Sequence, residues 1–423
     1  MKSDRTKIYG NSFLCAYILL LITTLLCSIA NAKTKPLKVN AREAVLMEAE
    51  TRKILVSQNC HERIQPASFT KIVTLYLVFE AIENGQIQLT DMVPISKRAW
   101  RTGGSKMFVR VGTRVPLEEL IKGIAVVSGN DACVAVAEYL QGSVENFVDK
   151  MNELVRKLGL KDTHFSTPNG LPSKNQYSTA YDMAMIAASY IERFPQALKY
   201  HSMQEFTYQG ITQNNRNRLL RKAPDLIDGL KTGYVADAGY HLIATGKKKN
   251  MRLIAVVMGA TKPSIREKEA LKLIYYGFGN FAKLDLIDKG KPVTRVKVWK
   301  GKTDEVNLVA RSSGHVVVPV SEKSTVKVDI DAPKSLFAPL KKGEIKGEAR
   351  ILSGTKTLKN VDLAVEKDIP RAGVIKRFYQ SVLLLGIKTD INRLSIALLP
   401  ALVLLVFVYF LVKRRRRKRR RFY

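Results

Sequence analysis

Residues 66–83 have the sequence PASFTKIVTLYLVFEAIE, and this stretch decides the fold of the chain. After the proline, apolar residues dominate over a length that is typical of a helix rather than a strand. Asn84-Gly85 follows at once and predicts the end of the helix. We therefore expect one long apolar helix that begins near Ser68.

Strand-like segments lie on both sides of this helix. Residues 41–59 predict two short strands around Glu50-Thr51-Arg52. Three more strands, separated by Gly-containing turns, are expected at 226–231, 241–245 and 251–258. Further helices are expected near 116–128, 131–140, 144–158, 179–193 and 264–276. The sequence thus predicts one α/β domain over residues 33–283, with an antiparallel sheet built from both ends of the segment and a helical block between them.

A different pattern begins near residue 284. Short runs of alternating apolar and polar residues, separated by turn residues, continue to residue 370 and predict a small all-β domain, a sandwich. Residues 371–393 then form a linker. Its stretch VIKRFYQSVLLLG is amphipathic, and we expect it to lie at a membrane surface.

The two ends of the chain predict export and a membrane span. Residues 1–32 combine basic residues, an apolar run and Ala30-Asn31-Ala32, which is typical of a cleaved secretory signal. Residues 394–412 carry no charge, and as a helix they would extend about 28 Å, enough to cross a bilayer. The tail, 413–423, begins with nine basic residues and is predicted to be cytoplasmic. We expect a single-pass protein of the cytoplasmic (inner) membrane with residues 33–393 on its periplasmic, extracytoplasmic face.

Composition narrows the possible partners. The 423 residues are 46% apolar and 25% charged, which is globular composition, and the net charge is +33. Such an excess predicts an anionic neighbour. An extracytoplasmic location argues against nucleic acid, so the basic tail is expected to bind lipid headgroups. Scattered histidines predict no metal and no cofactor, and Cys60 and Cys133 are expected to be free buried thiols.

Three short motifs occur in order along the predicted α/β domain. They are Ser68-Phe69-Thr70-Lys71, Ser128-Gly129-Asn130 and Lys231-Thr232-Gly233. The S-x-x-K pattern recurs at Ser324 and Ser353, but those copies lie in strand-like sequence. Ser68 alone stands at the start of a long apolar helix, so the first motif is the candidate nucleophile site.

The spacing of Ser68 and Lys71 suits nucleophilic catalysis. Residues three apart at a helix start project on one face. A serine hydroxyl is a poor nucleophile until a base removes its proton. Lysine can be that base only if its pKa falls well below about 10.4, through burial or a nearby cation such as Lys231. The positive end of the helix would favour a developing oxyanion.

The remaining motif residues predict substrate contacts. We expect Ser128 to relay a proton to the leaving nitrogen and Asn130 to hold a substrate amide. Lys231 and Thr232 are expected to bind a carboxylate. Gly233 would let substrate pair along the strand edge, where a side chain would obstruct it.

The sequence resembles the low-molecular-mass penicillin-binding proteins, the serine-type D-alanyl-D-alanine carboxypeptidases. The resemblance covers nearly the whole mature chain and includes residues 66–71, 104–108, 128–133, 228–233, 238–240 and 257–260. It implies a penicillin-recognising, β-lactamase/transpeptidase-like α/β domain, a β-sandwich and a membrane anchor. It also implies a role in peptidoglycan maturation and cell shape.

The resemblance further implies a substrate and a reaction. Ser68 would attack the penultimate D-Ala carbonyl of a peptidoglycan stem peptide ending in D-Ala-D-Ala, and water would hydrolyse the acyl-enzyme. β-Lactam antibiotics would acylate the same serine. Backbone N–H groups of Ser68 and Tyr234 would form the oxyanion hole, Arg216 would lie near the substrate carboxylate, and Arg266 would lie behind the sheet.

Two residues depart from the family pattern, and other functions remain open. Asn169 stands where several relatives carry His, which bears on deacylation, and Val235 stands where Thr is common. The membrane segment after the amphipathic stretch is a further departure. A D,D-endopeptidase or a β-lactamase would use the same groups, and a catalytically idle envelope scaffold is the alternative from another class.

Overall fold

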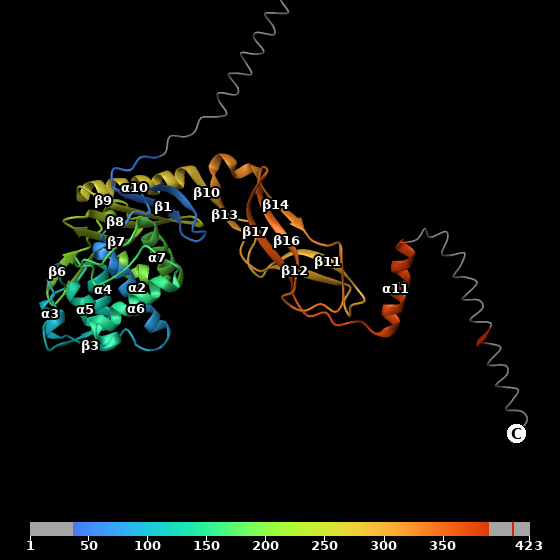
Figure 1. Cartoon of the computed structure of the whole chain (residues 1–423), viewed down its shortest axis with the longest axis horizontal. Coiled ribbons are helices and arrows are strands. Elements are labelled where there is room, and N and C mark those ends of the chain that lie inside the picture. Colours follow the sequence, from blue (N-terminus) through green and yellow to red (C-terminus); the bar gives the residue numbers. More distant parts are fainter. Residues whose placement is uncertain (1–36, 389–407, 410–423) are drawn as a thin grey trace, which may run out of the picture. The chain divides into compact units, whose positions relative to one another are not determined.

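The structure is a computed structural model that describes residues 37–388 and 408–409 (Figure 1). The chain divides into two units between Gly277 and Phe278. The predicted signal segment lies outside the described residues, as do the basic tail and the predicted span 394–412 apart from Val408 and Tyr409. Among the residues that are described, no helix is both long and apolar enough to cross a membrane.

The first unit is built on a five-stranded antiparallel sheet. Its strand order is β2-β1-β9-β8-β7, so strands from the two ends of the unit meet in the middle of the sheet. The strands are β1 (Glu43–Glu48), β2 (Ile54–Gln58), β7 (Ile227–Val235), β8 (Gly239–Lys248) and β9 (Met251–Ala260). This confirms the predicted α/β class and the sheet made from both ends of the segment.

A helical block separates the two groups of strands. Its helices are the 3₁₀ turn η1 (Ala67–Phe69), α2 (Thr70–Glu83), α3 (Lys97–Arg101), α4 (Leu117–Ala125), α5 (Asn130–Gln141), α6 (Val144–Lys157), α7 (Ala180–Arg193), the 3₁₀ turn η2 (Pro195–Ala197), α8 (Leu198–His201) and α9 (Leu219–Lys222). Helix α10 (Pro263–Asn280) follows the last strand. Two antiparallel strand pairs were not predicted: β3 (Met92–Pro94) with β4 (Arg114–Pro116), which are connected through α3, and the hairpin of β5 (Glu205–Tyr208) and β6 (Ile211–Asn214).

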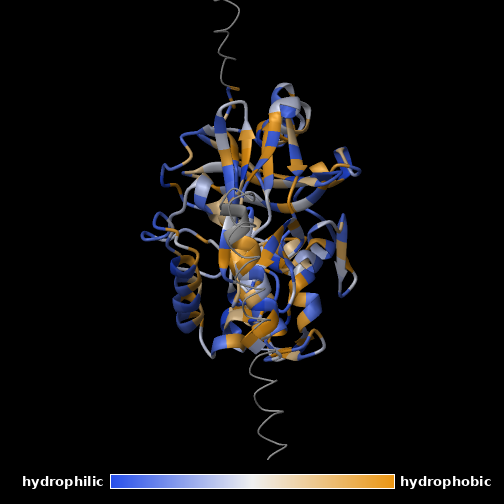
Figure 2. Cartoon of the chain, turned by 90° about the vertical axis from the view of Figure 1, so that its right-hand side faces the viewer, coloured by the Kyte–Doolittle hydropathy of each residue, from blue (hydrophilic) through white to orange (hydrophobic). Residues whose placement is uncertain are grey.

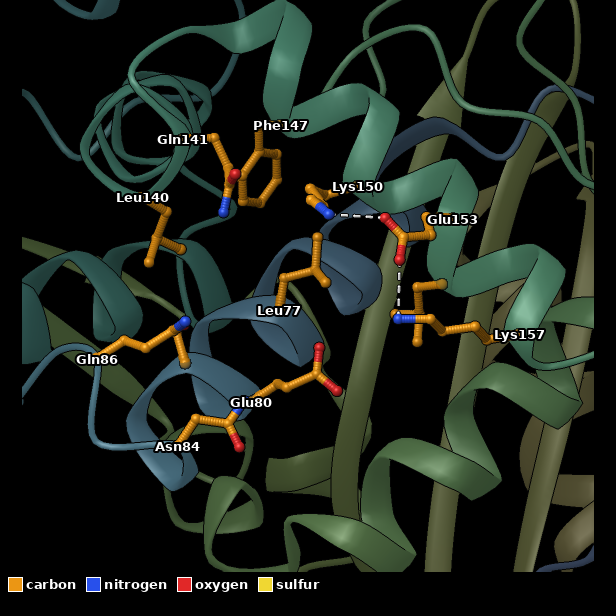
Figure 3. Close-up of a pocket in the computed structure, with 12 residues that line it drawn as sticks. Leu77, Glu80, Asn84, Gln86, Leu140, Gln141, Phe147, Lys150, Glu153 and Lys157 are labelled. Atoms are coloured by element: carbon orange, nitrogen blue, oxygen red, sulfur yellow. Dashed lines mark hydrogen bonds and ion pairs between the residues drawn. The ribbon is translucent and has the colours of Figure 1, made fainter.

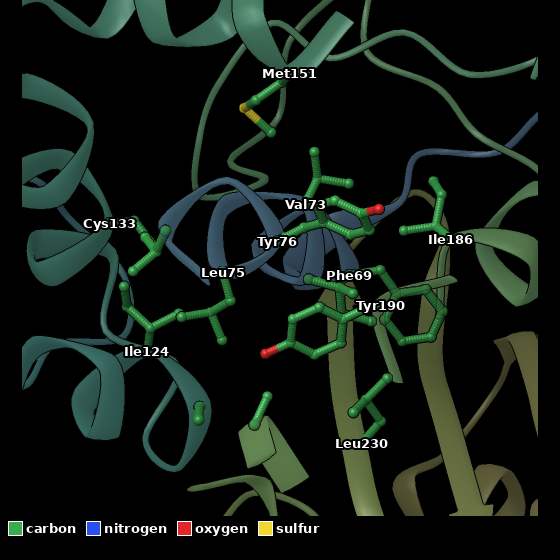
Figure 4. Packing of buried hydrophobic residues seen from close by; sticks show 14 of the residues in the cluster. Phe69, Val73, Leu75, Tyr76, Ile124, Cys133, Met151, Ile186, Tyr190 and Leu230 are labelled. Atoms are coloured by element: carbon green, nitrogen blue, oxygen red, sulfur yellow. The ribbon is translucent and has the colours of Figure 1, made fainter. Parts of the chain in front are cut away.

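Helix α2 is the centre of the hydrophobic core. It is apolar on nearly every side because α5, α6, α7 and α4 all pack against it. Val73 and Leu75 are fully buried, and they extend toward a cluster that includes Cys133, Met151 and Tyr190 (Figure 4). Burial of the helix on nearly every side fixes the position of the 3₁₀ turn that leads into it, where Ser68 lies.

The second unit is a β domain. Its main sheet has the order β14-β16-β17-β12-β11-β15, and β10 pairs with β13. The strands are β10 (Phe281–Asp285), β11 (Pro292–Trp299), β12 (Glu305–Ala310), β13 (His315–Pro319), β14 (Val326–Asp331), β15 (Ser335–Phe337), β16 (Ile345–Ser353) and β17 (Lys356–Val365), with the 3₁₀ turn η3 (Val320–Thr325). Every second residue of β12 is buried, as the sequence pattern predicts. Figure 2 shows hydrophobic and hydrophilic residues interspersed along the strands of the chain.

Helix α11 (Val374–Lys388) follows this domain and is amphipathic. Its polar side contacts the β domain, where Gln380 accepts a hydrogen bond from the Lys300 N–H and Lys376 pairs with Asp304. Its apolar side chains are largely exposed, including Ile375 at 87% and Phe378 at 73%.

Candidate active site

Ser68 lies in the 3₁₀ turn that leads into α2, and Lys71 lies in the first turn of that helix. Ala67, the residue before Ser68, has a positive φ of 50°. A loop crosses directly over it: a Cβ on Gly170 would lie only 1.8 Å from the Ala67 carbonyl oxygen. Only glycine fits this close approach, which presses the loop around residue 170 onto the turn that carries Ser68.

The Lys71 amine is fully buried beside the Ser68 hydroxyl. Its Nζ donates to Ser68 Oγ at 2.9 Å, Asn130 Oδ1 at 2.7 Å and the Asn169 carbonyl at 2.5 Å. Burial lowers the pKa of Lys71 to about 8. Two of the three partners can only accept hydrogen bonds, whereas a hydroxyl can also donate. In the neutral amine, the lone pair therefore points at Ser68.

Lys231 joins the second and third motifs. It lies on β7 and donates to Ser128 Oγ at 3.0 Å and to the Thr232 carbonyl at 3.1 Å. Burial, and then the charge of Lys71, hold the pKa of Lys231 well below its ordinary value. Ser128 itself has a positive φ of 63°, a strained conformation of the kind that clusters at functional sites.

A cavity of about 540 Å³ opens above these groups. The predicted site residues that line it are Ser68, Ser128, Asn130, Arg216, Thr232, Gly233 and Tyr234, together with Asn169, Val235 and Arg266. Lys71 and Lys231 are buried beneath the cavity, each in contact with a serine that lines it. All nine predicted site residues are thus brought to one place.

Arg266 contacts the strand that carries the third motif. This buried side chain from α10 donates to the carbonyls of Gly233 and His241 and so ties β7 to β8. A Cβ on Gly233 would lie 3.2 Å from Ala67 Cβ, so glycine here permits β7 to pack closely on the Ser68 turn. The expected role of Gly233 in letting substrate pair along the strand edge stays a prediction. Tyr234 is exposed and stacks on Tyr240 at 4.4 Å.

Comparison with known protein families shows which family this chain belongs to. The family described as D-alanyl-D-alanine carboxypeptidase matches residues 29–262, and the family described as Penicillin-binding protein 5, C-terminal domain, matches residues 281–371. The chain belongs to the D-alanyl-D-alanine carboxypeptidase family. The resemblance drawn from the three motifs is thereby confirmed.

Curated relatives cover most of this carboxypeptidase-family chain. D-alanyl-D-alanine carboxypeptidase DacA of Haemophilus influenzae is 40% identical, over 82% of this chain and 90% of the relative. DacC of Escherichia coli is 39% identical, over 82% and 88%. Penicillin binding protein 5 from H. influenzae has a similar solved structure, with a TM-score of 0.75 and 40% identity over 80% of this chain and all of that chain. Penicillin-binding protein D2 from Listeria monocytogenes, in its ampicillin-bound form, aligns with a TM-score of 0.53 and 26% identity, over 58% of this chain and all of that chain.

Two site features of this family member were missed by sequence reasoning. One is the Asn169 backbone carbonyl, which contacts Lys71, so the Asn-for-His departure leaves that contact intact. The other is Asp131. Its buried carboxylate accepts the N–H groups of Met107, Phe108 and Val109 at 2.9–3.3 Å and so holds the loop that lines the cavity. The position of Asp131 directly after the second motif was an available signal.

Other features of the chain lie apart from this site. Cys60 and Cys133 are free as expected, but Cys60 is only half-buried. Within residues 37–388 and 408–409, no group of three or more His, Cys, Asp or Glu side chains could hold a metal. A second cavity, of about 330 Å³, lies by α2, α5 and α6 (Figure 3). It contains none of the predicted site residues, and its Glu153 is paired with Lys150 and Lys157.

Proposed function

We propose that this family member is a serine-type D-alanyl-D-alanine carboxypeptidase that removes the terminal D-Ala from peptidoglycan stem pentapeptides through an acyl-enzyme on Ser68. The observation that carries the proposal is the buried Lys71 amine, 2.9 Å from Ser68 Oγ. Its pKa of about 8 makes the neutral, basic form accessible near physiological pH.

Acylation would begin with proton transfer from Ser68 to Lys71. Ser68 Oγ then attacks the carbonyl carbon of the penultimate D-Ala, and the N–H groups of Ser68 and Tyr234 receive the oxyanion. When the C–N bond breaks, the Ser128 hydroxyl, polarised by Lys231, protonates the leaving nitrogen. Lys71 then passes the proton that it took from Ser68 to Ser128, so that overall one proton moves from Ser68 to the released D-alanine.

Deacylation would use the same groups. Lys71, neutral again, takes a proton from a water molecule that attacks the ester carbonyl, and the proton returns to Ser68 as the acyl bond breaks. Asn130 would hold the substrate amide, while Thr232, Lys231 and Arg216 would bind the terminal carboxylate. β-Lactams would enter the same cavity and acylate Ser68.

The location of the protein belongs to the same proposal. The exposed apolar side of α11 supports contact with a membrane surface. The predicted span 394–412, with its basic tail against anionic lipid headgroups, would hold the catalytic unit at the extracytoplasmic face of the inner membrane. Deleting residues 394–423 should release a soluble protein that still cleaves small peptides. An inactive product would show that the membrane segment is more than an anchor.

The central experiment is mass spectrometry of the protein after exposure to penicillin. We expect one covalent adduct on the peptide that holds Ser68, and no adduct in a folded Ser68→Ala variant. Release of D-alanine from a pentapeptide, with cross-linked peptides left intact, would separate the carboxypeptidase from the D,D-endopeptidase. Rapid release of the penicillin adduct would favour the β-lactamase. An adduct elsewhere would refute the assignment of Ser68.

A further inference from the structure

We propose that a cationic rim beside the cavity binds carboxylates of the polymer that carries the stem peptide, as a subsite separate from the cavity itself. The cationic rim consists of Lys97, Arg101, Lys106 and Arg110, with the exposed ring of Trp100 among them. The inference rests on the proposed function, because it concerns a longer form of the same substrate.

The charged residues in the segment that carries the cationic rim are all basic. Residues 97–114 contain six basic residues and no Asp or Glu. Among the described residues, only Arg98 of these six forms an ion pair, with Glu145. The side chains of Lys97, Arg101 and Arg110 are exposed. Cations that the protein does not neutralise attract anionic ligands, and they do so most strongly when several lie together.

Hydrogen bonds connect the cationic rim to the cavity. Arg216, in the cavity wall, donates to Gln213 Oε1 at 3.4 Å. Gln213 Nε2 donates to the Lys106 carbonyl at 3.0 Å. Lys106 Nζ in turn donates to the Trp100 carbonyl at 2.8 Å. Positive groups therefore continue from the cavity to α3, and Figure 1 shows α3 and β6 on the same side of the first unit.

The rim is held in place before any ligand binds. Asn130 Nδ2 donates to the Gly103 carbonyl, and the Asn130 N–H donates to the Ser105 carbonyl. Gly104 packs so closely on Asn130 that a Cβ would lie 2.6 Å from its amide nitrogen. The backbone between Arg101 and Lys106 therefore loses little conformational entropy on binding. Trp100 is 42% exposed and offers an apolar face beside the cations.

The occupant that fits is a carboxylate-bearing polymer. A stem peptide has acidic groups besides its C-terminus, and many such peptides project from one strand. Binding one carboxylate-bearing region at the rim would raise the local concentration of scissile termini at the cavity. A short tripeptide whose only charge is its C-terminal carboxylate would fill the cavity without reaching α3, since neither Lys97 nor Arg101 lines the cavity.

The test compares two substrates in the full-length protein. The variant is Lys97→Gln with Arg101→Gln. The matched control is Arg98→Gln, which removes a charge from the same helix, but on the side that faces Glu145. The substrates are purified uncross-linked peptidoglycan strands with pentapeptides and an N-acylated tripeptide ending in D-Ala-D-Ala, whose only charge is its C-terminal carboxylate. Co-sedimentation with the strands measures binding without catalysis.

We expect kcat/KM on strands to fall about 5- to 10-fold in the double variant, through KM, with tripeptide hydrolysis and penicillin acylation unchanged. The Arg98→Gln control should stay within about two-fold of wild type on both substrates. Raising salt from about 50 to about 300 mM should raise the wild-type KM for strands and affect the variant less.

Two outcomes would overturn the proposal. Unchanged activity on strands would show that the rim does not bind the polymer, and an equal loss on both substrates would show that it acts on the cavity. If wild-type protein cleaved neither substrate, the proposed function would fail, while co-sedimentation would still test the rim. Equal co-sedimentation of the wild type and the double variant would then refute binding of the polymer at the cationic rim.

Discussion

Lys231 Nζ lies 3.0 Å from Ser128 Oγ, although 103 residues separate them along the chain. One residue comes from the edge strand of the sheet and the other from the turn before α5, so this contact joins the sheet to the helical block. Burial is the first cause of the lowered pKa of both lysines, and the Lys71 charge is the second for Lys231. Lys231 thus donates a hydrogen bond to Ser128, the serine that we propose as the proton relay.

The rate of penicillin acylation should depend on pH through Lys71. Because the base must be neutral and its pKa is about 8, the rate should rise about tenfold per unit below pH 8 and level off above it. Stopped-flow acylation from pH 5 to 10 measures this profile, and a flat profile would contradict the assignment. Lys71→Arg should lower the plateau by about 10²–10⁴-fold, since guanidinium stays protonated.

Ser128→Ala and Lys231→Ala should each slow acylation by about 10²–10⁴-fold, because each interrupts the same proton path. The double variant should be no slower than the slower single variant, as expected of residues that act as a unit. Single-turnover measurements of the acylation rate of the wild type and all three variants complete this double-mutant cycle. Multiplicative losses would mean that the two side chains act independently.

Asp131→Asn should disturb the loop that lines the cavity. An amide has one acceptor oxygen where the carboxylate has two, so one of its NH₂ hydrogens would face a backbone N–H of Met107, Phe108 or Val109. We expect a free energy of unfolding lower by about 1–3 kcal/mol and a raised KM for the tripeptide with a smaller change in kcat. Urea denaturation and steady-state kinetics test this. The exposed Asp149→Asn is the control, and matching behaviour of the two variants would contradict the positioning role.

Glu43 should make stability fall as pH rises. Its carboxyl is buried on β1 and has no hydrogen-bond partner among the described residues, and burial raises its pKa to about 8. The folded state therefore holds a proton that the unfolded state releases above pH about 4.5. Glu43→Gln should have little effect at pH 4 and should stabilise the protein increasingly from about pH 4.5 to 8. Urea midpoints at pH 4, 6 and 8 measure the trend, and a constant difference across that range would refute it.

The sequence by itself determined the class of the first unit and the start of its central helix. The apolar run after Pro66 needs no long-range information, since length and composition alone distinguish a buried helix from a strand. The strand pairs β3–β4 and β5–β6 were missed because each strand has only three or four residues. Patterns that short carry no recognisable period.

The tertiary structure alone decided how the three motifs meet. Spacing predicted the Ser68–Lys71 pair because both lie within one turn of chain. It could not predict that the Asn169 carbonyl would contact Lys71, or that Asp131 would hold the loop over the cavity. Such contacts depend on backbone atoms and on segments far apart in the chain. The pKa of Lys71 is likewise a property of the assembled site, because burial by the surrounding helices and loops lowers it.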